Sequence, residues 1–376
     1  MLDPNALKQQ AVDQTGLDNF GDEPLNDGLI AFCESLRLES CLPQPRLKQA
    51  EASIVATLSE RLRIEACLQQ NPSILDEQII SPIFVVGLPR SGTTALSQLL
   101  SEDPQMRSIR RWESTQVTPP PDVSVKHDPR IEDTTRAFAA RDAALPALKT
   151  MLAVEPADPS EHGIQLGLTF RNLQLPSLWP TPSYTQWLQA ADMRPAYAYF
   201  AKVLKILQWK TPAPCWNLKN PPDIFSLDAI AAVFPDARFV WAHRDPLLSI
   251  PSVCSLVSTI REASGEAVNK AALGRMQLDF QSAGVKSAMQ ARDQLSDRIF
   301  ADVYQKDLDE DPIRTLQVLY DAVGREFTDD YKSRLHSRLK SRPKGKHGAH
   351  TYTREEFGLD APELRSAFKD YIDRFH

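Results

Sequence analysis

Residues 81–100 constrain the fold of this chain more than any other segment. A continuous apolar run, residues 83–86, precedes a loop that holds two glycines, and a helical pattern of leucines follows from Thr93. A run that is apolar on both faces is typical of a strand buried inside a parallel sheet. The order of strand, glycine loop and helix therefore predicts an α/β fold.

The glycine loop itself, residues 87–94, predicts an anion site. Gly87 and Gly92 match the phosphate-loop spacing, and the helix that follows adds roughly half a positive charge at its N-terminus. The lysine that normally follows the second glycine is replaced by Thr93, and Arg90 lies inside the loop. A nucleotide kinase or other NTPase normally needs that lysine, so the loop suits an anion with less charge than a triphosphate. The alternative is a glycine turn of purely structural use.

The rest of the chain predicts a central parallel sheet flanked by helices, as in P-loop nucleotide kinases. Further strands are expected at residues 215–218, 238–242 and 299–304, with a crossover helix over residues 228–234. Residues 1–80 have helical periodicity and predict a helical N-terminal segment, with an α/β domain over residues 81–376. Other helices are expected at residues 131–152, 161–173, 195–209, 246–262, 268–295 and 312–324.

Composition excludes several classes of protein. The 376 residues include only 14 glycines against 29 prolines, with 42% hydrophobic and 24% charged residues, which fits a globular chain and not a collagen-like or disordered one. No signal peptide and no apolar run of membrane-spanning length is apparent, so we expect a cytoplasmic protein. Five cysteines without a Cys-x-x-Cys pair indicate reduced thiols, and the seven histidines form no metal-spaced set.

Positive charge is concentrated near the C-terminus. The net charge is 43 − 49 = −6, but residues 332–354 contain eight lysines and arginines and no acidic residue. The remainder of the chain therefore carries −6 − 8 = −14. An acidic body argues against a nucleic-acid partner, and the basic window predicts either a local anion site or a solvated helix face.

Three motifs together resemble one enzyme family. GLPRSGTT, WNLKNP and FVWAHRDPLLSIPSVCS occur in this order. They resemble the sulfotransferases that use 3′-phosphoadenosine 5′-phosphosulfate (PAPS), and most closely the bacterial branch related to tyrosylprotein sulfotransferases. The resemblance covers most of residues 80–376, and the helical N-terminal lead is also similar to that branch.

The resemblance implies a donor site. In the family the PRSGTT loop holds the 5′-phosphosulfate, and an arginine with a serine eight residues later grips the 3′-phosphate. Here Arg244 and Ser252 have that spacing, and Arg244 directly follows a predicted strand, where ligands of α/β sheets bind. PAPS is then the co-substrate, 3′,5′-ADP the product, and no metal is needed. The implied loop residues are Arg90, Ser91, Gly92, Thr93 and Thr94.

The resemblance also implies catalytic residues. Lys219 and Arg90 would stabilise the charge that moves to the leaving oxygen during sulfuryl transfer. Glu113, which follows the loop helix, would be the base that deprotonates the acceptor hydroxyl. Three alternatives for this base stay open: Glu161, His162 and His127.

The resemblance also implies a late basic loop that closes over the nucleotide, with Arg342, Lys344 and Lys346 as its candidate contacts. The acceptor is predicted to be a small molecule or glycan, and the protein to have no membrane span. Four aromatic residues either line the pocket for the acceptor or belong to the core: Trp112, Trp179, Tyr184 and Trp187. Two other functions compete with sulfuryl transfer, namely a P-loop kinase or NTPase and a nucleotide-binding protein without turnover.

Overall fold

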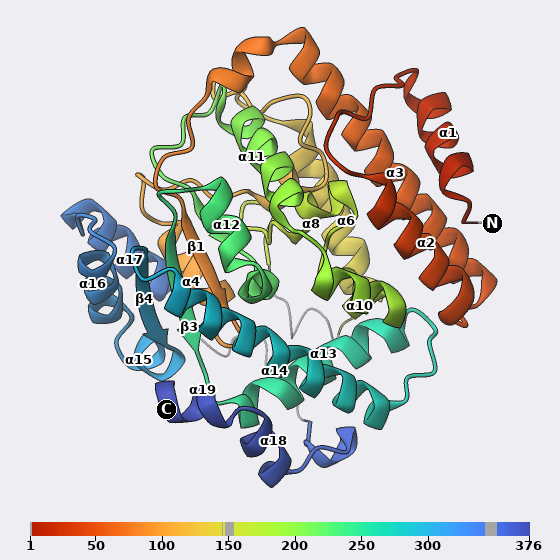
Figure 1. Ribbon diagram of the computed structural model, residues 1–376. Helices are drawn as coiled ribbons and strands as arrows, with labels where there is room; N and C mark the ends of the chain where they lie inside the picture. Colours follow the sequence, from red (N-terminus) through yellow and green to blue (C-terminus); the bar gives the residue numbers. More distant parts are fainter. Residues whose placement is uncertain (1, 145, 147–153, 343–351) are drawn as a thin grey trace.

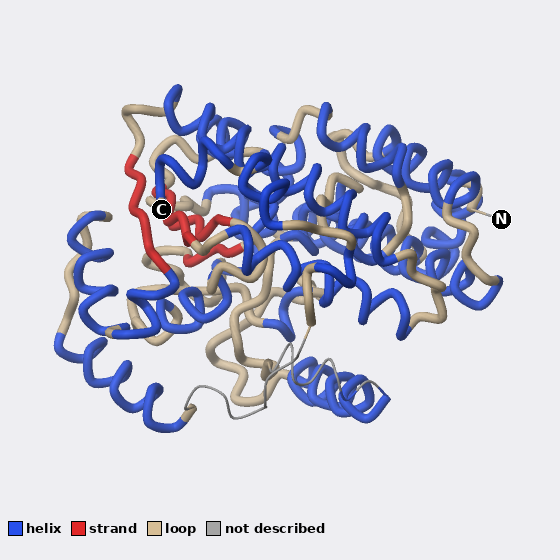
Figure 2. Tube along the Cα trace, turned by 90° about the horizontal axis from the view of Figure 1, so that it is seen from below, coloured by secondary structure: helices blue, strands red, loops and turns tan. Residues whose placement is uncertain are grey.

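A four-stranded parallel sheet forms the centre of the molecule. The computed structural model describes residues 2–144, 146, 154–342 and 352–376. The strands lie in the order β2-β1-β3-β4, and every neighbouring pair is parallel. Figure 2 shows these strands as one layer with helices around it. The predicted α/β class is confirmed; the strands are β1 (Ile83–Gly87), β2 (Asn217–Lys219), β3 (Arg238–His243) and β4 (Ile299–Tyr304).

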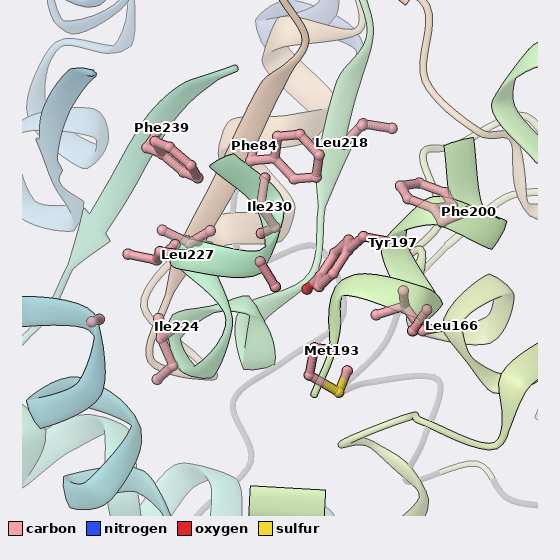
Figure 3. Packing of buried hydrophobic residues seen from close by; sticks show 14 of the residues in the cluster. Phe84, Leu166, Met193, Tyr197, Phe200, Leu218, Ile224, Leu227, Ile230 and Phe239 are labelled. Atoms are coloured by element: carbon pink, nitrogen blue, oxygen red, sulfur yellow. The ribbon is translucent and has the colours of Figure 1, made fainter. Parts of the chain in front are cut away.

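The two faces of the sheet pack into two different cores. Side chains of β1 alternate, so that Phe84 and Val86 lie in one cluster and Ile83 and Val85 in the other. Figure 3 shows the first cluster, in which Phe84 packs beside residues of β2, α11 and α12. Both faces are covered by helices, which explains why the β1 sequence is continuously apolar.

Helices make up most of the remaining described chain (Figure 1). The N-terminal helices are α1 (Pro4–Thr15), α2 (Asn26–Glu39) and α3 (Gln44–Gln70), and η1 (Pro72–Asp76) leads into the sheet. The central helices are α4 (Thr93–Leu100), α5 (Arg111–Ser114), α6 (Pro129–Ala144), α8 (Gly163–Leu166), η2 (Gly167–Thr169), α9 (Leu175–Leu178), α10 (Pro182–Ala190), α11 (Arg194–Gln208), η3 (Pro221–Phe225) and α12 (Leu227–Val233). The later helices are α13 (Pro246–Ala263), α14 (Lys270–Gln294), α15 (Gln305–Glu310), α16 (Pro312–Ala322), α17 (Asp329–Ser341), η4 (Glu355–Phe357), α18 (Ala361–Ala367) and α19 (Lys369–Phe375).

The N-terminal helices have a core of their own that extends into a later segment. Leucines and phenylalanines of α1, α2 and α3 pack with Phe170, Trp179, Tyr184 and Leu188. The helical lead is therefore joined to residues 170–188 by buried apolar contacts. Among the described residues, no helix is long and apolar enough to span a bilayer.

Three expectations differ from the structure in detail. The expected strand 215–218 is shifted to Asn217–Lys219, and Trp216, just before it, forms a bridge with Arg107. The expected helix 161–173 is two short turns, ended where Phe170 takes a left-handed conformation with φ 53°. Residues 182–190, where no helix was expected, form α10, and Pro182 lies in its first turn, where its missing N–H costs nothing.

Candidate active site

The carboxyl ends of β1, β2 and β3 bring the predicted site residues to one edge of the sheet. Gly87 ends β1, Lys219 ends β2, and Arg244 follows His243 at the end of β3. Strands that run parallel end at the same edge, where open α/β sheets bind their ligands.

Backbone geometry of the glycine loop explains its glycines. A Cβ on Gly87 would lie 2.4 Å from the carbonyl oxygen of Ala242, so β1 and β3 approach too closely for any side chain. Gly92 has φ 90° and is the N-cap of α4, a conformation that disfavours other residues. The first N–H groups of α4 have no partner within the helix and face the loop.

Arg90 joins the glycine loop to the residues after β3. It takes a left-handed conformation, with φ 67°. Its Nε donates to Ser252 Oγ (3.2 Å), and Arg244 Nη1 donates to its carbonyl oxygen (2.8 Å). The structure therefore brings together Arg90, Arg244 and Ser252, the three residues predicted to hold the two ends of the donor.

Lys219 and Glu161 form an ion pair beside the loop. Lys219 Nζ lies 2.5 Å from Glu161 Oε1 and donates to Thr94 Oγ1 over 3.2 Å. Backbone pairing holds Glu161 and Lys219 together. The two residues form a parallel bridge, and the N–H of His162 donates to the carbonyl oxygen of Lys219. The Lys219 side chain is only 1% exposed, whereas that of Glu161 is 32% exposed. Glu161 is thus the more exposed member of the pair.

The charges around Glu161 favour its ionised form. Desolvation opposes ionisation, but Lys219, Arg111 and a hydrogen bond from Gln174 together hold the pKa of this carboxyl below its usual value. The same desolvation, with Arg111 nearby, lowers the pKa of Lys219, although Glu161 opposes that shift. Glu161 is therefore a carboxylate at neutral pH.

Positive charge exceeds negative charge at this edge. Arg90 and Arg111 both lie within electrostatic reach of Glu161, and desolvation lowers the pKa of each guanidinium. With Lys219, three cationic residues lie within electrostatic reach of Glu161, and a fourth, Arg244, contacts the backbone of Arg90. These cations are partly desolvated and outnumber their acidic partners. Such a site fits a ligand with several negative charges.

Glu113 lies in a closed environment. Its carboxylate accepts from Arg107 Nη2 (2.8 Å) and Nη1 (3.3 Å), and it also accepts from the N–H of Arg110 (2.8 Å). The last contact is part of a capping box at the start of α5. The side chain is 3% exposed. All its described contacts are structural ones.

The other two candidates for the base are two histidines: His162 is closed off from solvent, and His127 lies away from the site. His162 is 1% exposed and stacks on Phe200 with ring centroids 4.7 Å apart. Its Nε2 lies 2.8 Å from Asp223 Oδ2, without the alignment of a hydrogen bond. His127 is exposed and pairs with Glu132 on α6 (3.0 Å).

Of the late basic residues, Arg342 lies among acids. It bonds to Asp158 (3.1 and 3.2 Å) and pairs with Glu155. With Ser101 it lines a hollow at the C-terminal end of α4, about 12 Å along that helix from the glycine loop. Lys344 and Lys346 lie outside the described residues.

The four aromatic candidates are mostly core residues. Trp179 and Tyr184 are buried in the N-terminal core, and Trp187 stacks on Tyr184 with centroids 5.9 Å apart. Trp112 lies under the guanidinium of Arg130, at 4.8 Å.

Two residues of the site were not predicted from the sequence. Arg111 was not among the predicted site residues, and Gln174 carried no signal of its own. Gln174 Nε2 donates to Glu161 Oε2, and a Cβ on Gly163 would lie 2.5 Å from Gln174 Oε1. The glycine in the SEHG sequence was the one available hint, because it marks a close approach.

Comparisons with known proteins agree with this geometry. The model of the Sulfotransferase family matches residues 82–329, which include the glycine loop, Glu161, Lys219, Arg244 and Ser252. None of the curated proteins is significantly similar.

Two solved structures are similar over almost the whole chain. The sulfotransferase STF9 from Mycobacterium avium is 28% identical with a TM-score of 0.90, over 99% of this chain and 96% of its own. The sulfotransferase STF1 from Mycobacterium tuberculosis H37Rv is 27% identical with a TM-score of 0.87, over 97% of this chain and 98% of its own. A family match over most of the chain and a site of this charge lead to one conclusion: this chain belongs to the sulfotransferase family.

Proposed function

We propose that this protein transfers the sulfuryl group of PAPS to the hydroxyl of an acceptor. The observation that carries the proposal is the junction of Arg90 with Arg244 and Ser252 beside the N-terminus of α4. This junction offers two guanidinium groups, a hydroxyl and free backbone N–H groups to a ligand with a phosphate at each end. Arg244 and Ser252 hold the 3′-phosphate, and the glycine loop holds the 5′-phosphosulfate.

Glu161 is the base in this proposal. It is ionised, it is more exposed than Glu113, and it lies beside Lys219 at the mouth of the glycine loop. Glu113 already accepts three hydrogen bonds from fixed donors, so it has little capacity left for a substrate proton.

The transfer uses these residues in one displacement. Glu161 takes the proton of the acceptor hydroxyl, whose oxygen forms a bond to sulfur while the bond from sulfur to the 5′-phosphate oxygen breaks. Lys219 leaves Glu161 to neutralise that leaving oxygen, and Arg90 stabilises the equatorial charge. The products are the sulfated acceptor and 3′,5′-ADP, and the proton on Glu161 passes to water.

Ligand binding gives the first test. We expect 3′,5′-ADP to raise the thermal unfolding temperature, since a ligand at 100 times its Kd stabilises a fold by about 2.7 kcal/mol. The Arg244→Ala variant should bind it about 10- to 100-fold more weakly, because a hydrogen bond to a charged group contributes about 1.5–3 kcal/mol. Arg194→Ala is the matched control, because Arg194 is exposed and its ion pair in the described structure is with nearby Asp192.

Turnover gives the second test. Sulfate transfer from radiolabelled PAPS to a library of alcohols should occur with the native chain and fall sharply in Arg90→Ala. Full activity of Arg90→Ala would overturn the proposal. Stabilisation by ATP with Mg²⁺ but not by 3′,5′-ADP would instead favour a kinase or NTPase.

A further inference from the structure

A solvent-open cavity lies beside the catalytic cluster and belongs to none of the motifs discussed so far. Its volume is about 790 Å³, within the range of small-molecule sites. Its walls come from the turn between α2 and α3, from residues 176–189 and from the end of α13 with the start of α14. Figure 1 shows α10 next to the turn between α13 and α14, where this cavity lies.

The floor of the cavity is apolar and its polar groups are already bonded. Leu42, Pro176 and Leu273 are buried in it. Thr181 Oγ1 donates to Trp179 O (3.2 Å), and Thr185 Oγ1 donates to Thr181 O (2.8 Å). The floor therefore offers contact area more than hydrogen bonds, which favours a hydrocarbon body.

The charges in the cavity cancel. Arg261 and Glu266 are the charged residues that line it, and their side chains lie 3.5 Å apart. The remaining donors of Arg261 bond to the carbonyl oxygens of Pro176 and Ser177. An ionic ligand would gain no free counter-charge here, so an uncharged ligand fits best.

One wall of the cavity is continuous with the residue that holds Glu161. Pro176 lines the cavity, and Gln174, two residues earlier, donates to the Glu161 carboxylate. Consecutive Cα atoms are about 3.8 Å apart, so these two residues lie within about 7.6 Å of one another. A ligand that fills the cavity therefore lies near the segment that holds Glu161.

The wall is rigidly held. Arg46 of α3 donates to Leu178 O (3.0 Å) and stacks on Trp179 at 3.9 Å, while Arg261 of α13 binds the preceding carbonyls. Two buried arginines thus hold α9, which carries Pro176 of the cavity wall, in place.

We propose that this cavity binds the apolar body of an uncharged, lipid-like alcohol and presents its hydroxyl to Glu161. This assignment of the acceptor class rests on the sulfuryl transfer proposed above. The cavity itself, as a site for an apolar neutral molecule, does not depend on it.

The chain carries a reporter at the cavity rim. Cys41 lines the cavity and is an exposed free thiol, whereas Cys33, Cys67, Cys215 and Cys254 are buried. Alkylation of Cys41 by N-ethylmaleimide, followed by mass spectrometry of its peptide, therefore reports occupancy in the full chain without PAPS.

The probe is n-dodecanol, with laurate as the charged counterpart. At about ten times its Kd, dodecanol leaves about one tenth of the cavity free, so Cys41 alkylation should slow about ten-fold. Laurate should protect at least several-fold less. The Ala272→Trp variant fills the exposed rim of the cavity and should abolish protection of Cys41. Ala263 is exposed at the end of α13 and does not line the cavity, so Ala263→Trp should retain protection.

Turnover then tests the acceptor role. With PAPS, Ala272→Trp should lower kcat/KM for dodecanol about ten-fold or more and leave 3′,5′-ADP binding unchanged. Unprotected Cys41, or protection that survives Ala272→Trp, would overturn the site. Protection with kcat/KM unaffected by Ala272→Trp would overturn the acceptor role. Protection by dodecanol with no transfer to any alcohol would contradict the proposed sulfuryl transfer alone.

Discussion

Two glutamates next to arginines differ in environment, and this difference is why we propose one of them and not the other as the base. Glu113 is closed in by Arg107 and by the backbone of α5, and its side chain is 3% exposed. Glu161 is 32% exposed, and its partners are a lysine and a glutamine at the edge of the glycine loop. Both are ion-paired, so pairing alone does not identify a catalytic group.

The difference lies in what holds each partner. Arg107 is fixed by further bonds, because it also donates to Leu207 O (2.9 Å) and stacks over Trp216 at 4.6 Å. Within the described part of the chain, the Lys219 ammonium donates to the side chains of Thr94 and Glu161, and its long stem can redirect it. A pair with one adjustable member can open during a reaction, and a fully bonded pair cannot open without loss of stability.

The largest expected effect is on turnover. Glu161→Gln keeps the shape of the side chain but removes the base, so we expect kcat for sulfate transfer to fall about 10²- to 10⁴-fold. Binding of 3′,5′-ADP should change little. Glu113→Gln is the matched variant, and a larger loss of kcat in it than in Glu161→Gln would reverse the assignment of the base.

Glu113→Gln should act on stability instead. Loss of the carboxylate charge leaves the buried guanidinium of Arg107 unpaired, so the free energy of unfolding in urea should fall by about 3–5 kcal/mol. Glu132→Gln breaks an exposed pair with His127 and should cost below about 1 kcal/mol. Equal small losses in both variants would show that the Glu113 pair is not structural.

Sequence alone predicted the parts of the site that are local. The strand, glycine loop and helix follow one another along the chain, and Arg244 and Ser252 lie on one segment, so their order and spacing were readable. The structure brings Ser252 to Arg90, so two of the predicted donor residues lie side by side.

Tertiary contacts account for what the sequence left open. Glu161 reaches Lys219, 58 residues away, through a backbone bridge at the end of β2. No periodicity records such a bridge, so Glu161 stayed one of several candidates. Gln174 was missed for the same reason, because its link to Glu161 depends on the break after η2, where helical periodicity predicted a continuous helix.

Lys219→Met tests whether the adjustable partner is needed. Removing the ammonium should lower kcat about 10²- to 10³-fold, as for loss of one group that stabilises developing charge. It should also raise the pKa of Glu161, since Lys219 opposes the effect of desolvation there. Lys210→Met, on an exposed lysine that pairs with Asp122, is the control, and an equal loss of kcat there would show a non-specific effect.

The smallest expected effect isolates the positioning of Glu161 by Gln174. Activity needs the ionised carboxylate, so kcat/KM falls as pH drops through the pKa of Glu161, which lies below its usual value. Gln174→Leu removes a hydrogen bond to the charged form, worth about 1.5–3 kcal/mol, so this acidic limb should move up by about 1–2 pH units. At alkaline pH, where Glu161 is ionised in either protein, much of the activity should return. The exposed Gln294→Leu variant should leave the pH profile unchanged. A uniform loss of kcat/KM at all pH values in Gln174→Leu would mean that this amide supports the fold of residues 170–178 and does not tune the base.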